Sequence, residues 1–367
     1  MDYYTLGNTG LKVSRLALGT MTFGDDWGWG ADEANARQLF DIYLEAGGNF
    51  FDTADLYTNG NSERMLGRFI QESGTRDRVV ITTKFSYNAE PNNPNAGGNG
   101  RKNILRAVEG SLKRLNTDYI DVYMLHTWDL VTPAAEVMRT LDDLVRSGKV
   151  RYIGLSDAPA WYVAQAQTIA QERHWEPVST VQLEYSLAER HIEFEYTALA
   201  RHLSPSIMVW SPLASGLLSG KYRPSEQGGE GEGRLAMLAG SGNPAFDKFT
   251  DKNWAIVAEL EKVAQELERS MAQIALNWVA NRPSVASVIV GATKLHQLKD
   301  NLGALDFAIP PALHQRLESI SRPARQFPYT FFEPSLQGMI NGGATVGDKP
   351  QSYQQAVLVE GAGAGVS

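Results

Sequence analysis

The sequence contains no cysteine, which excludes disulfide bonds and metal sites built from thiolates. Its six histidines are scattered and show no His-Glu-x-x-His or other metal-ligand spacing, so we expect no metal. No apolar run approaches the ~20 residues of a membrane-spanning helix, and the first residues lack a basic stretch followed by an apolar one. We therefore expect a cytoplasmic protein that does not enter a membrane.

A clustered basic surface is also missing. The net charge is −8, and the nearest approach to a basic run, between Arg101 and Arg114, has the spacing of a solvated helix flank. We therefore expect no nucleic-acid partner. The 367 residues are 43% hydrophobic and 21% charged, which is enough for a sizeable core in one large domain or two ordinary ones.

The stretch from Gly48 to Glu63 organises the rest of the chain. Phe50 and Phe51 favour a buried strand, and the apolar character stops at Asp52. A polar loop with Tyr57 follows, and Ser62 with Glu63 is typical of a helix start. The stretch predicts a strand-loop-helix unit with ionisable groups at the end of the strand.

The same alternation of a short apolar run, a polar loop and a helical pattern recurs along the chain. The expected strands are residues 15–19, 49–52, 79–83, 119–125, 152–155, 180–183, 207–210 and 287–290. The expected helices are residues 33–46, 63–71, 102–115, 134–147, 160–172, 194–202, 254–280 and 295–302, the seventh breaking in two near Arg269 and Ser270. Strands that are apolar throughout and alternate with helices indicate a parallel sheet covered by helices.

Eight strand-helix units predict an α/β fold, a closed (β/α)8 TIM barrel, with a doubly wound open sheet as the alternative. The position of polar residues favours the barrel, because each falls near the C-terminal end of a different strand, and a barrel builds its site at that rim. These residues are Thr20, Asp52, Lys84, His126, Ser156, Gln182, Ser211 and Thr293.

Other segments are added to this barrel. Residues 3–6 and 11–13 flank a glycine-rich turn and predict an N-terminal β-hairpin that covers one end of the core. The connections 86–100 and 213–250 are long rim loops expected to shape access to the site.

We expect a single barrel domain over residues 1–320 and a C-terminal tail over 321–367. The aromatic run from Phe327 to Phe332 should pack on the barrel, whereas the Gly-Ala repeat at 361–365 should be mobile. That repeat has no strand before it and no helix after it, so it is not a dinucleotide-binding fingerprint.

Three of the strand-end residues, Asp52, Lys84 and His126, suggest a chemistry together with Tyr57 from the loop after the second strand. Each alone has an ordinary structural explanation, such as a cap for Asp52 or a core position for His126. If the strands are neighbours, however, a carboxylate, a phenol, an ammonium and an imidazole surround one small space. Lys84, held by Asp52, would stabilise the phenolate of Tyr57, and neutral His126 would orient a carbonyl oxygen. Such a set can protonate a carbonyl oxygen, but the hydride must come from a nicotinamide cofactor.

The chain resembles the aldo-keto reductase superfamily, in its longer bacterial and potassium-channel-beta-subunit-like branch, over roughly residues 3–320. The motifs that carry the resemblance are Gly19-Thr20-Met21, Asp52 to Tyr57, Thr83-Lys84, Leu125-His126, Gly154 to Ser156, Gln182 with Tyr185, Trp210 to Lys221, and Gly291 to Thr293 with Gln297 and Asn301.

The resemblance implies a catalytic tetrad of Asp52, Tyr57, Lys84 and His126, with Tyr57 as the general acid. It also implies a cofactor bound across the strand ends. Ser156 and Gln182 would bind the nicotinamide carboxamide, next to Asp157, and Trp210 would stack on the ring. Further cofactor contacts are Gly19, Thr20, Met21, Gly291 and, along the pyrophosphate, Ser211, Leu213 and Ser215. Lys221, Arg234, Thr293 and Lys294 would bind the ribose 2′-phosphate, and Gln297, Asp300 and Asn301 the adenine.

The cationic groups favour NADP(H) over NAD(H). One departure from the family is visible, because Asp157 stands where the family usually has Asn. An ionised carboxylate accepts but does not donate hydrogen bonds, which would alter nicotinamide affinity or hydride direction.

We therefore expect an NADP(H)-dependent oxidoreductase that interconverts aldehydes or ketones and alcohols. The alternatives are a cofactor-binding regulatory module like the channel beta subunits and a barrel of unrelated chemistry. Trp27, Tyr87 and Trp128 suggest an apolar substrate pocket for bulky or ring-containing small molecules, with loop packing as the other interpretation. The sequence does not fix the oligomeric state.

Overall fold

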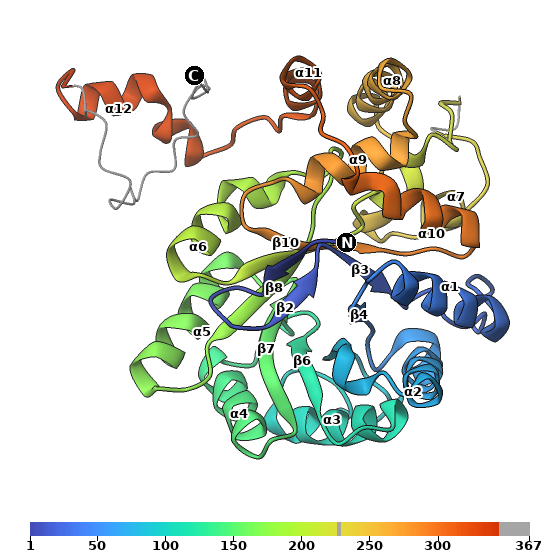
Figure 1. Cartoon of the computed structure of the whole chain (residues 1–367). Helices are drawn as coiled ribbons and strands as arrows, with labels where there is room; N and C mark the ends of the chain where they lie inside the picture. The colour runs from blue at the N-terminus through green and yellow to red at the C-terminus, as the bar shows by residue number, and fades with distance from the viewer. Residues whose placement is uncertain (226–228, 345–367) are drawn as a thin grey trace.

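The computed structural model describes residues 1–225 and 229–344 and shows a closed barrel of eight parallel strands surrounded by helices (Figure 1). Around the barrel the strands follow the order β10-β3-β4-β5-β6-β7-β8-β9. Their bounds are β3 (Leu16–Gly19), β4 (Phe50–Asp52), β5 (Val80–Phe85), β6 (Ile120–Leu125), β7 (Val150–Ser156), β8 (Val178–Glu184), β9 (Ser206–Trp210) and β10 (Val285–Val290). The barrel prediction is confirmed, and the open sheet is excluded.

Helices connect successive strands and cover the outside of the barrel (Figure 1). They are α1 (Glu33–Glu45), α2 (Asn61–Ser73), α3 (Arg101–Leu115), α4 (Ala134–Arg146), α5 (Ala160–Arg173), α6 (Tyr196–Leu203), α7 (Arg234–Leu238), α8 (Asp251–Glu266), α9 (Met271–Ala280) and α10 (Leu295–Leu302). The predicted break after α8 is present, and Ser270 caps α9 by accepting a hydrogen bond from the backbone N–H of Gln273.

The strands are buried on both faces, and two apolar clusters result. The inner cluster fills the barrel with side chains such as Phe50, Met124 and Met208. The outer cluster lies between the strands and the helices and includes Phe40, Phe51 and Trp278. Burial on both sides explains why the strands are apolar throughout rather than alternating.

The predicted N-terminal hairpin pairs β1 (Tyr3–Thr5) with β2 (Lys12–Ser14) in antiparallel fashion. Leu6 and Val13 are fully buried and belong to the inner cluster. The backbone N–H of Ser14 donates to the side chain of Asn49, just before β4. The hairpin therefore covers the end of the barrel at which the strands begin, and this end faces the viewer in Figure 1.

The predicted start of α2 at Ser62 is wrong. The helix begins at Asn61 after Gly60, whose φ of 84° is left-handed, and Ser62 does not cap it. Ser62 is instead fully buried and shares hydrogen bonds with the hydroxyls of Thr20 and Thr53. Its hydroxyl therefore connects the first helical turn to the ends of β3 and β4.

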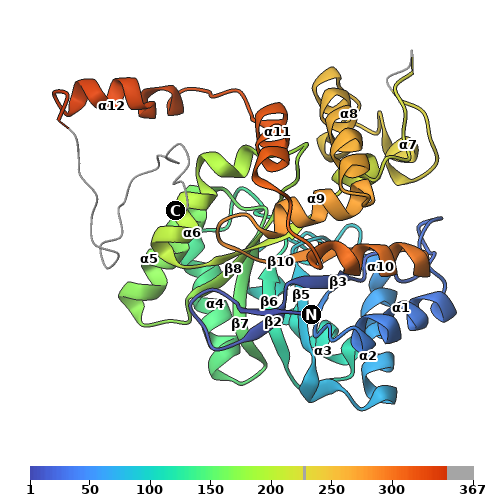
Figure 2. The same ribbon diagram turned by 45° about the horizontal axis from the view of Figure 1, so that its top comes forward.

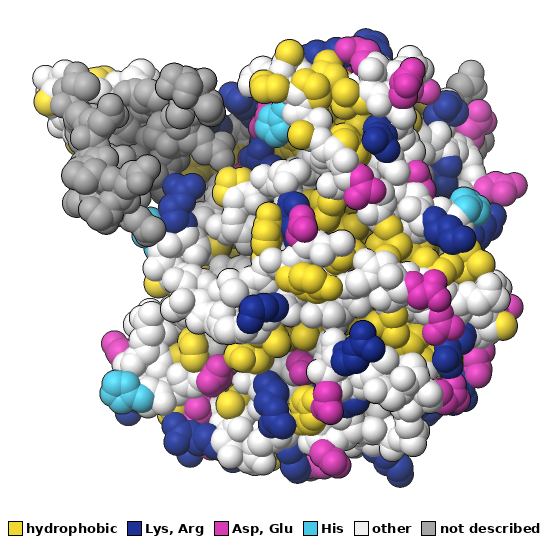
Figure 3. All heavy atoms as spheres, in the orientation of Figure 1, with side chains coloured by type: hydrophobic (Ala, Val, Ile, Leu, Met, Phe, Trp, Pro, Cys, Tyr) yellow, Lys and Arg dark blue, Asp and Glu magenta, His cyan; other side chains and the backbone are white. Residues whose placement is uncertain are grey.

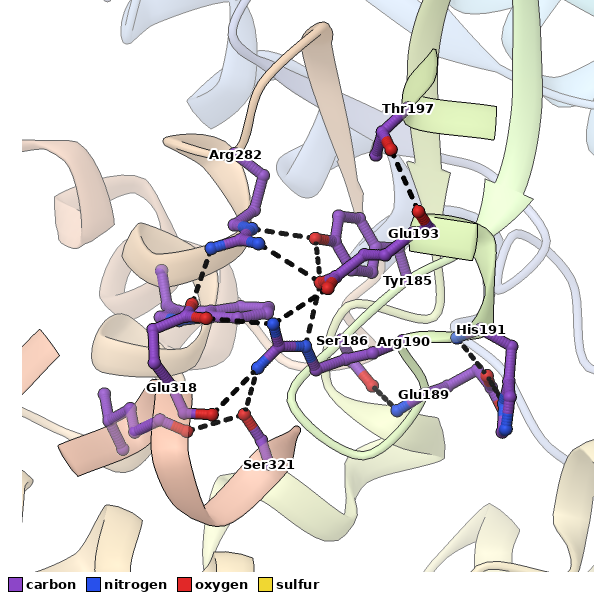
Figure 4. Close-up of polar contacts among 12 residues, drawn as sticks. Tyr185, Ser186, Glu189, Arg190, His191, Glu193, Thr197, Arg282, Glu318 and Ser321 are labelled. Atoms are coloured by element: carbon purple, nitrogen blue, oxygen red, sulfur yellow. Dashed lines mark hydrogen bonds and ion pairs between the residues drawn. The ribbon is translucent and has the colours of Figure 1, made fainter. Parts of the chain in front are cut away.

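A buried network of charges attaches α11 (Pro311–Ser321) to the barrel (Figure 4). Arg190 contacts Glu193 at 2.8 Å and Glu318 at 2.9 Å. Arg282 contacts the same two carboxylates, Glu318 at 2.5 Å and Glu193 at 3.2 Å. Two arginines and two glutamates thus neutralise one another, which compensates for the loss of hydration on burial.

The segment after α11 leads away from the barrel to α12 (Pro334–Ile340), which stands apart in both views (Figures 1 and 2). Tyr329 stacks on Phe194 at 5.0 Å and donates a hydrogen bond to Glu195. Phe327 and Phe331, however, are 80% and 56% exposed. The aromatic part of the tail therefore packs on the barrel less than its composition suggests, and residues 361–365 lie outside the described part.

The two long rim loops contain local structure. In the first, Asn99 exchanges two hydrogen bonds with Asp129 of the next connection, each 2.8 Å long. The second contains η4 (Ala214–Ser219), α7 and η5 (Pro244–Phe246). On the face shown in Figure 3, cations and anions are interspersed. No helix within residues 1–225 and 229–344 is long and apolar enough to cross a membrane.

Candidate active site

Four predicted residues meet at the C-terminal ends of three adjacent strands. Asp52 is the last residue of β4, and Lys84 is the last but one of β5. His126 directly follows β6. Tyr57 begins the short helix η1 (Tyr57–Gly60), which continues from β4. Because β4, β5 and β6 are hydrogen-bonded neighbours, the barrel brings all four side chains to one side of its mouth.

Lys84 is the centre of this cluster. Its fully buried ammonium donates hydrogen bonds to Asp52 Oδ2 and to the carbonyl oxygen of Thr53, both at 2.8 Å. It donates a third to Tyr57 Oη at 3.2 Å. An ammonium has three N–H donors, so all of them are used. Lys84 thereby fixes the phenol of Tyr57 relative to the carboxylate of Asp52.

Lys84 is positively charged at neutral pH. Burial acts to lower the pKa of Lys84, but Asp52 and Tyr57 outweigh it, so that the pKa is raised. The pKa of Tyr57 is also raised, because burial outweighs the stabilisation of the phenolate by Lys84. Lys84 does stabilise the phenolate of Tyr57, as expected, but burial has the larger effect on the pKa of Tyr57 in the free protein. Tyr57 keeps its proton at neutral pH, with a cation beside it.

His126 faces the phenol from the third strand. Its ring packs edge-on against that of Tyr57, with 5.8 Å between ring centroids. Burial and the charge of Lys84 hold the pKa of His126 well below 6.5, so the imidazole is neutral. Within the described part of the chain its Nδ1 is buried and has no hydrogen-bond partner. A neutral imidazole with an unused nitrogen can hydrogen-bond a substrate oxygen or relay a proton.

An unusual turn holds Tyr57 in place. Thr58 and Asn59 have left-handed φ angles of 45° and 55°. Thr58 donates a hydrogen bond to the carbonyl of Phe23 and accepts one from the backbone of Ser62. These two bonds stabilise the strained turn and direct the phenol toward Lys84.

Aromatic side chains surround the phenol on its open side. Trp27 packs edge-on against Tyr57, with 6.4 Å between ring centroids, and contacts Trp29. Tyr87 packs edge-on against His126 at 5.0 Å. Trp128 instead contacts Trp161 and Tyr162, and its N–H donates to Thr132. Two of the three predicted pocket residues therefore contact the tetrad.

The opposite side of the mouth carries the predicted nicotinamide residues. Gln182 donates a hydrogen bond of 2.8 Å to Asp52 Oδ1, which joins β8 to the tetrad. Ser156 ends β7, and its hydroxyl is buried without a hydrogen-bond partner among the described residues. The indole N–H of Trp210, at the end of β9, donates to Asp157 Oδ1 at 3.0 Å.

Three cations gather beyond Trp210. Lys221 follows η4, Arg234 begins α7, and Lys294 precedes α10. Burial and the like charges of Arg234 and Lys294 lower the pKa of Lys221. Among the described residues, none of the three forms an ion pair with a carboxylate. Arg234 packs on the rings of Trp29 and Phe246, 5.4 Å and 5.9 Å from their centroids.

Some of the remaining predicted cofactor contacts lie in a sharply turned loop, and others already form hydrogen bonds within the protein. The η4 loop turns sharply, with left-handed φ at Ser211 and Ser215 on either side of Leu213, and Ser211 Oγ accepts from the backbone of Ser215. Other predicted side chains already form hydrogen bonds within the protein. The hydroxyl of Thr20 donates to the backbone carbonyl of Asp52 and shares a hydrogen bond with Ser62. Gln297 accepts hydrogen bonds from the backbone N–H groups of Thr293 and Lys294, and Asp300 accepts one from Ser270. Gly19, Met21, Gly291 and Asn301 lie beside these groups at the ends of β3 and β10 and in α10.

Sequence reasoning missed one contact at the rim. Lys248, only 7% exposed at its side chain, lies 3.0 Å from Glu184 at the end of β8. The pair attaches the second rim loop to the barrel mouth. No local pattern indicates it, because the two residues are distant in sequence and the loop has no periodicity.

Comparison with known proteins agrees with this geometry. The Aldo/keto reductase family matches residues 15–322. The chain belongs to this family. It is 38% identical to an uncharacterized oxidoreductase, YrpG, of Bacillus subtilis, over 87% of this chain and 96% of that protein.

Two other relatives have more specific names. A probable voltage-gated potassium channel subunit beta of Oryza sativa is 36% identical, over 90% of this chain and all of that protein. An aryl-alcohol dehydrogenase [NADP(+)] of Phanerodontia chrysosporium is 32% identical, over 88% of this chain and 86% of that protein. The family and these relatives identify the chain as an oxidoreductase of a family that acts on small carbonyl substrates with NAD(P)H.

Proposed function

We propose that the protein is an NADP(H)-dependent oxidoreductase that interconverts aldehydes or ketones and alcohols, with Tyr57 as the general acid and base. The observation that carries the proposal is the bridging position of Lys84, which contacts Asp52 at 2.8 Å and Tyr57 at 3.2 Å while neutral His126 faces the phenol. The residues of this cluster can supply a proton, stabilise the phenolate left behind and orient a carbonyl.

Each residue has one task in carbonyl reduction. A reduced nicotinamide supplies the hydride that is added to the carbonyl carbon. Tyr57 donates its proton to the carbonyl oxygen, and the O–H bond of the alcohol forms as that of the phenol breaks. Lys84 stabilises the phenolate, and Asp52 holds Lys84 in place. The raised pKa of Tyr57 keeps the donor protonated, and Lys84 favours the charge that develops during transfer.

The residues present fit an NADP(H) molecule. Lys221, Arg234 and Lys294 are close enough for like charges to affect one another, and none of them forms an ion pair with a described carboxylate, although the charge of Glu184 acts on Arg234. A phosphate ester on the ribose would supply the missing anion, and NAD(H) lacks that group. At the other end, the unused hydroxyl of Ser156 offers a hydrogen bond to a carboxamide.

The aromatic side chains next to the phenol of Tyr57 indicate the substrate class. Trp27 and Tyr87 present aromatic surfaces beside the groups that deliver the proton, and Trp29 continues that surface. A substrate with a ring next to its carbonyl would bury apolar area against them. The name of the aryl-alcohol dehydrogenase relative supports the same class, so we include aromatic aldehydes and the corresponding alcohols among the substrates.

Replacement of Tyr57 tests the proposal. In the variant Tyr57→Phe, kcat for reduction of an aromatic aldehyde should fall by about 10²- to 10⁴-fold, because the proton donor is lost. The Kd for NADPH, measured by fluorescence quenching, should stay unchanged. Tyr87→Phe is the matched control, since Tyr87 contacts the ring of His126 but is half-exposed. Wild-type turnover by Tyr57→Phe would refute the assignment.

The second candidate is a cofactor-bound regulatory module. It is favoured by the similarity to the rice protein named as a probable potassium channel subunit beta. Such a module would bind NADPH with the same residues but turn over slowly. Steady-state rates on a panel of aromatic and aliphatic aldehydes separate the two candidates, because a regulatory module would bind NADPH tightly and yet show little reduction of any of them.

A further inference from the structure

Asp157 is an ionisable group of the mouth for which the proposed mechanism has no task. It follows β7 with a left-handed φ of 42°, and its backbone N–H donates to the carbonyl of Gln182. Its carboxylate accepts the indole N–H of Trp210 at 3.0 Å. The backbone bond and the indole bond hold the carboxylate beside Trp210, between the ends of β7 and β9.

The surroundings of Asp157 contain both signs of charge. Lys84 faces it from β5, and Glu184, paired with Lys248, faces it from β8. Three phenols also lie within electrostatic reach, from the β4 and β5 connections and from α6: Tyr57, Tyr87 and Tyr196. The side chain of Asp157 is exposed to solvent at the rim of the barrel, in contact with the indole of Trp210.

At this position the carboxylate titrates within the pH range in which cofactor binding can be measured. Burial and Glu184 raise the pKa of Asp157 to about 6, while Trp210 and Lys84 oppose the shift. Asp157 is therefore ionised at pH 7 and above and becomes neutral below about pH 6. Burial and the charge of Lys84 hold the pKa of His126 well below 6.5, and the raised pKa of Lys84 keeps its ammonium charged.

We propose that Asp157 is a specificity-determining residue that discriminates between the two oxidation states of the cofactor, because its carboxylate stabilises an oxidised nicotinamide more than a reduced one. The inference rests on the proposed function, in which Trp210 stacks on the nicotinamide ring. An oxidised ring carries a positive charge and a reduced ring carries none. A fixed anion bonded to the stacking residue attracts only the charged ring, and the surrounding protein keeps this attraction stronger than it would be in water.

The consequence is a bias toward the oxidised cofactor and so toward carbonyl reduction on the enzyme. The ratio of Kd for NADP⁺ to Kd for NADPH should be low at pH 8 and should rise as Asp157 becomes protonated below about pH 6. The 2′-phosphate also titrates near pH 6, but both cofactors carry it, and its contribution cancels in the ratio.

The experiment measures both dissociation constants by fluorescence quenching between pH 5 and pH 8, for the wild-type protein and for Asp157→Asn. An asparagine keeps an oxygen that can accept the indole N–H, so it removes the charge and leaves the contact. At pH 8 the ratio should be about three- to tenfold higher in Asp157→Asn than in wild type, and it should not depend on pH in the variant.

Glu184→Gln is the matched control, since Glu184 is another carboxylate of the same mouth but is paired with Lys248. It should shift the ratio less than Asp157→Asn does. An equal shift would mean that only the overall charge of the mouth matters and would overturn the proposal. So would a wild-type ratio that is constant from pH 5 to pH 8. Failure of the wild-type protein to bind either cofactor would instead refute the proposed function, and the inference with it.

Discussion

Two clusters of cations lie in the same chain and differ in their partners. Arg190 and Arg282 are almost fully buried, and each contacts both Glu193 and Glu318 (Figure 4). Within the described part of the chain, Lys221, Arg234 and Lys294 gather at the barrel mouth without any carboxylate partner.

The two clusters therefore have different roles. In the first, the protein itself supplies the anions, so the charges hold α11 against the barrel and leave nothing for a ligand. In the second, burial and the repulsion between like charges lower the pKa of Lys221, a cost that a bound anion would reduce. We propose that this cluster stabilises a bound phosphate rather than the fold.

The largest effect that separates the clusters is expected for Glu318→Gln. It should lower the free energy of unfolding by about 3 kcal/mol, because Arg190 and Arg282 remain buried with less compensating charge. Urea denaturation measures the loss, and Kd for NADPH should not change. Glu266→Gln is the control, because the pair that Glu266 forms with Arg316 at 2.7 Å lies on the exposed surface, where water screens it, so its loss should cost far less stability. Equal losses in both variants would contradict the structural role of the network.

A smaller effect, on cofactor binding rather than on stability, is expected for Lys221→Met. The substitution keeps most of the aliphatic stem and removes the charge, so Kd for NADPH should rise about ten- to hundredfold while the free energy of unfolding stays the same or increases. Binding of NADH serves as the internal control, since NADH has no 2′-phosphate for the charge to contact. If the affinities for NADPH and NADH fell together, Lys221 would not be a phosphate ligand.

The smallest effect is expected for Lys294→Met. Lys294 is exposed, and water screens its charge more than that of Lys221. We expect Kd for NADPH to rise about threefold, with no change in NADH affinity. Titrations at about 0.05 M and about 0.5 M salt should show that this difference shrinks at high salt. A larger loss than in Lys221→Met would reverse the assignment of the two lysines.

Much of the fold could be predicted because strand ends are local features. The apolar run that ends at Asp52 and the one that contains Lys84 both appear in a few consecutive residues, and a parallel barrel places all such ends at one rim. The start of α2 could not be predicted in this way. Ser62 has the residue type of a cap, but Thr20 and Thr53 take its hydrogen bonds in the folded chain.

Interactions between distant residues account for the other differences. Arg190 and Glu318 are 128 residues apart in the sequence, and Arg282 belongs to a third segment that shares no motif with either, so their network emerges only from the fold. The pKa of Tyr57 also depends on residues that are distant in sequence. Sequence indicates the neighbouring lysine, but the degree of burial, which decides the direction of the shift, depends on the whole mouth.

The position of the N-terminal hairpin has a practical consequence. Met1 and β1 lie at the end of the barrel where the strands begin, opposite the mouth that contains Tyr57 (Figures 1 and 2). An enzyme coupled through its first residue to a bead or an electrode would therefore present its reactive opening to the surrounding solution, whereas coupling through the rim loops would block diffusion of reactants.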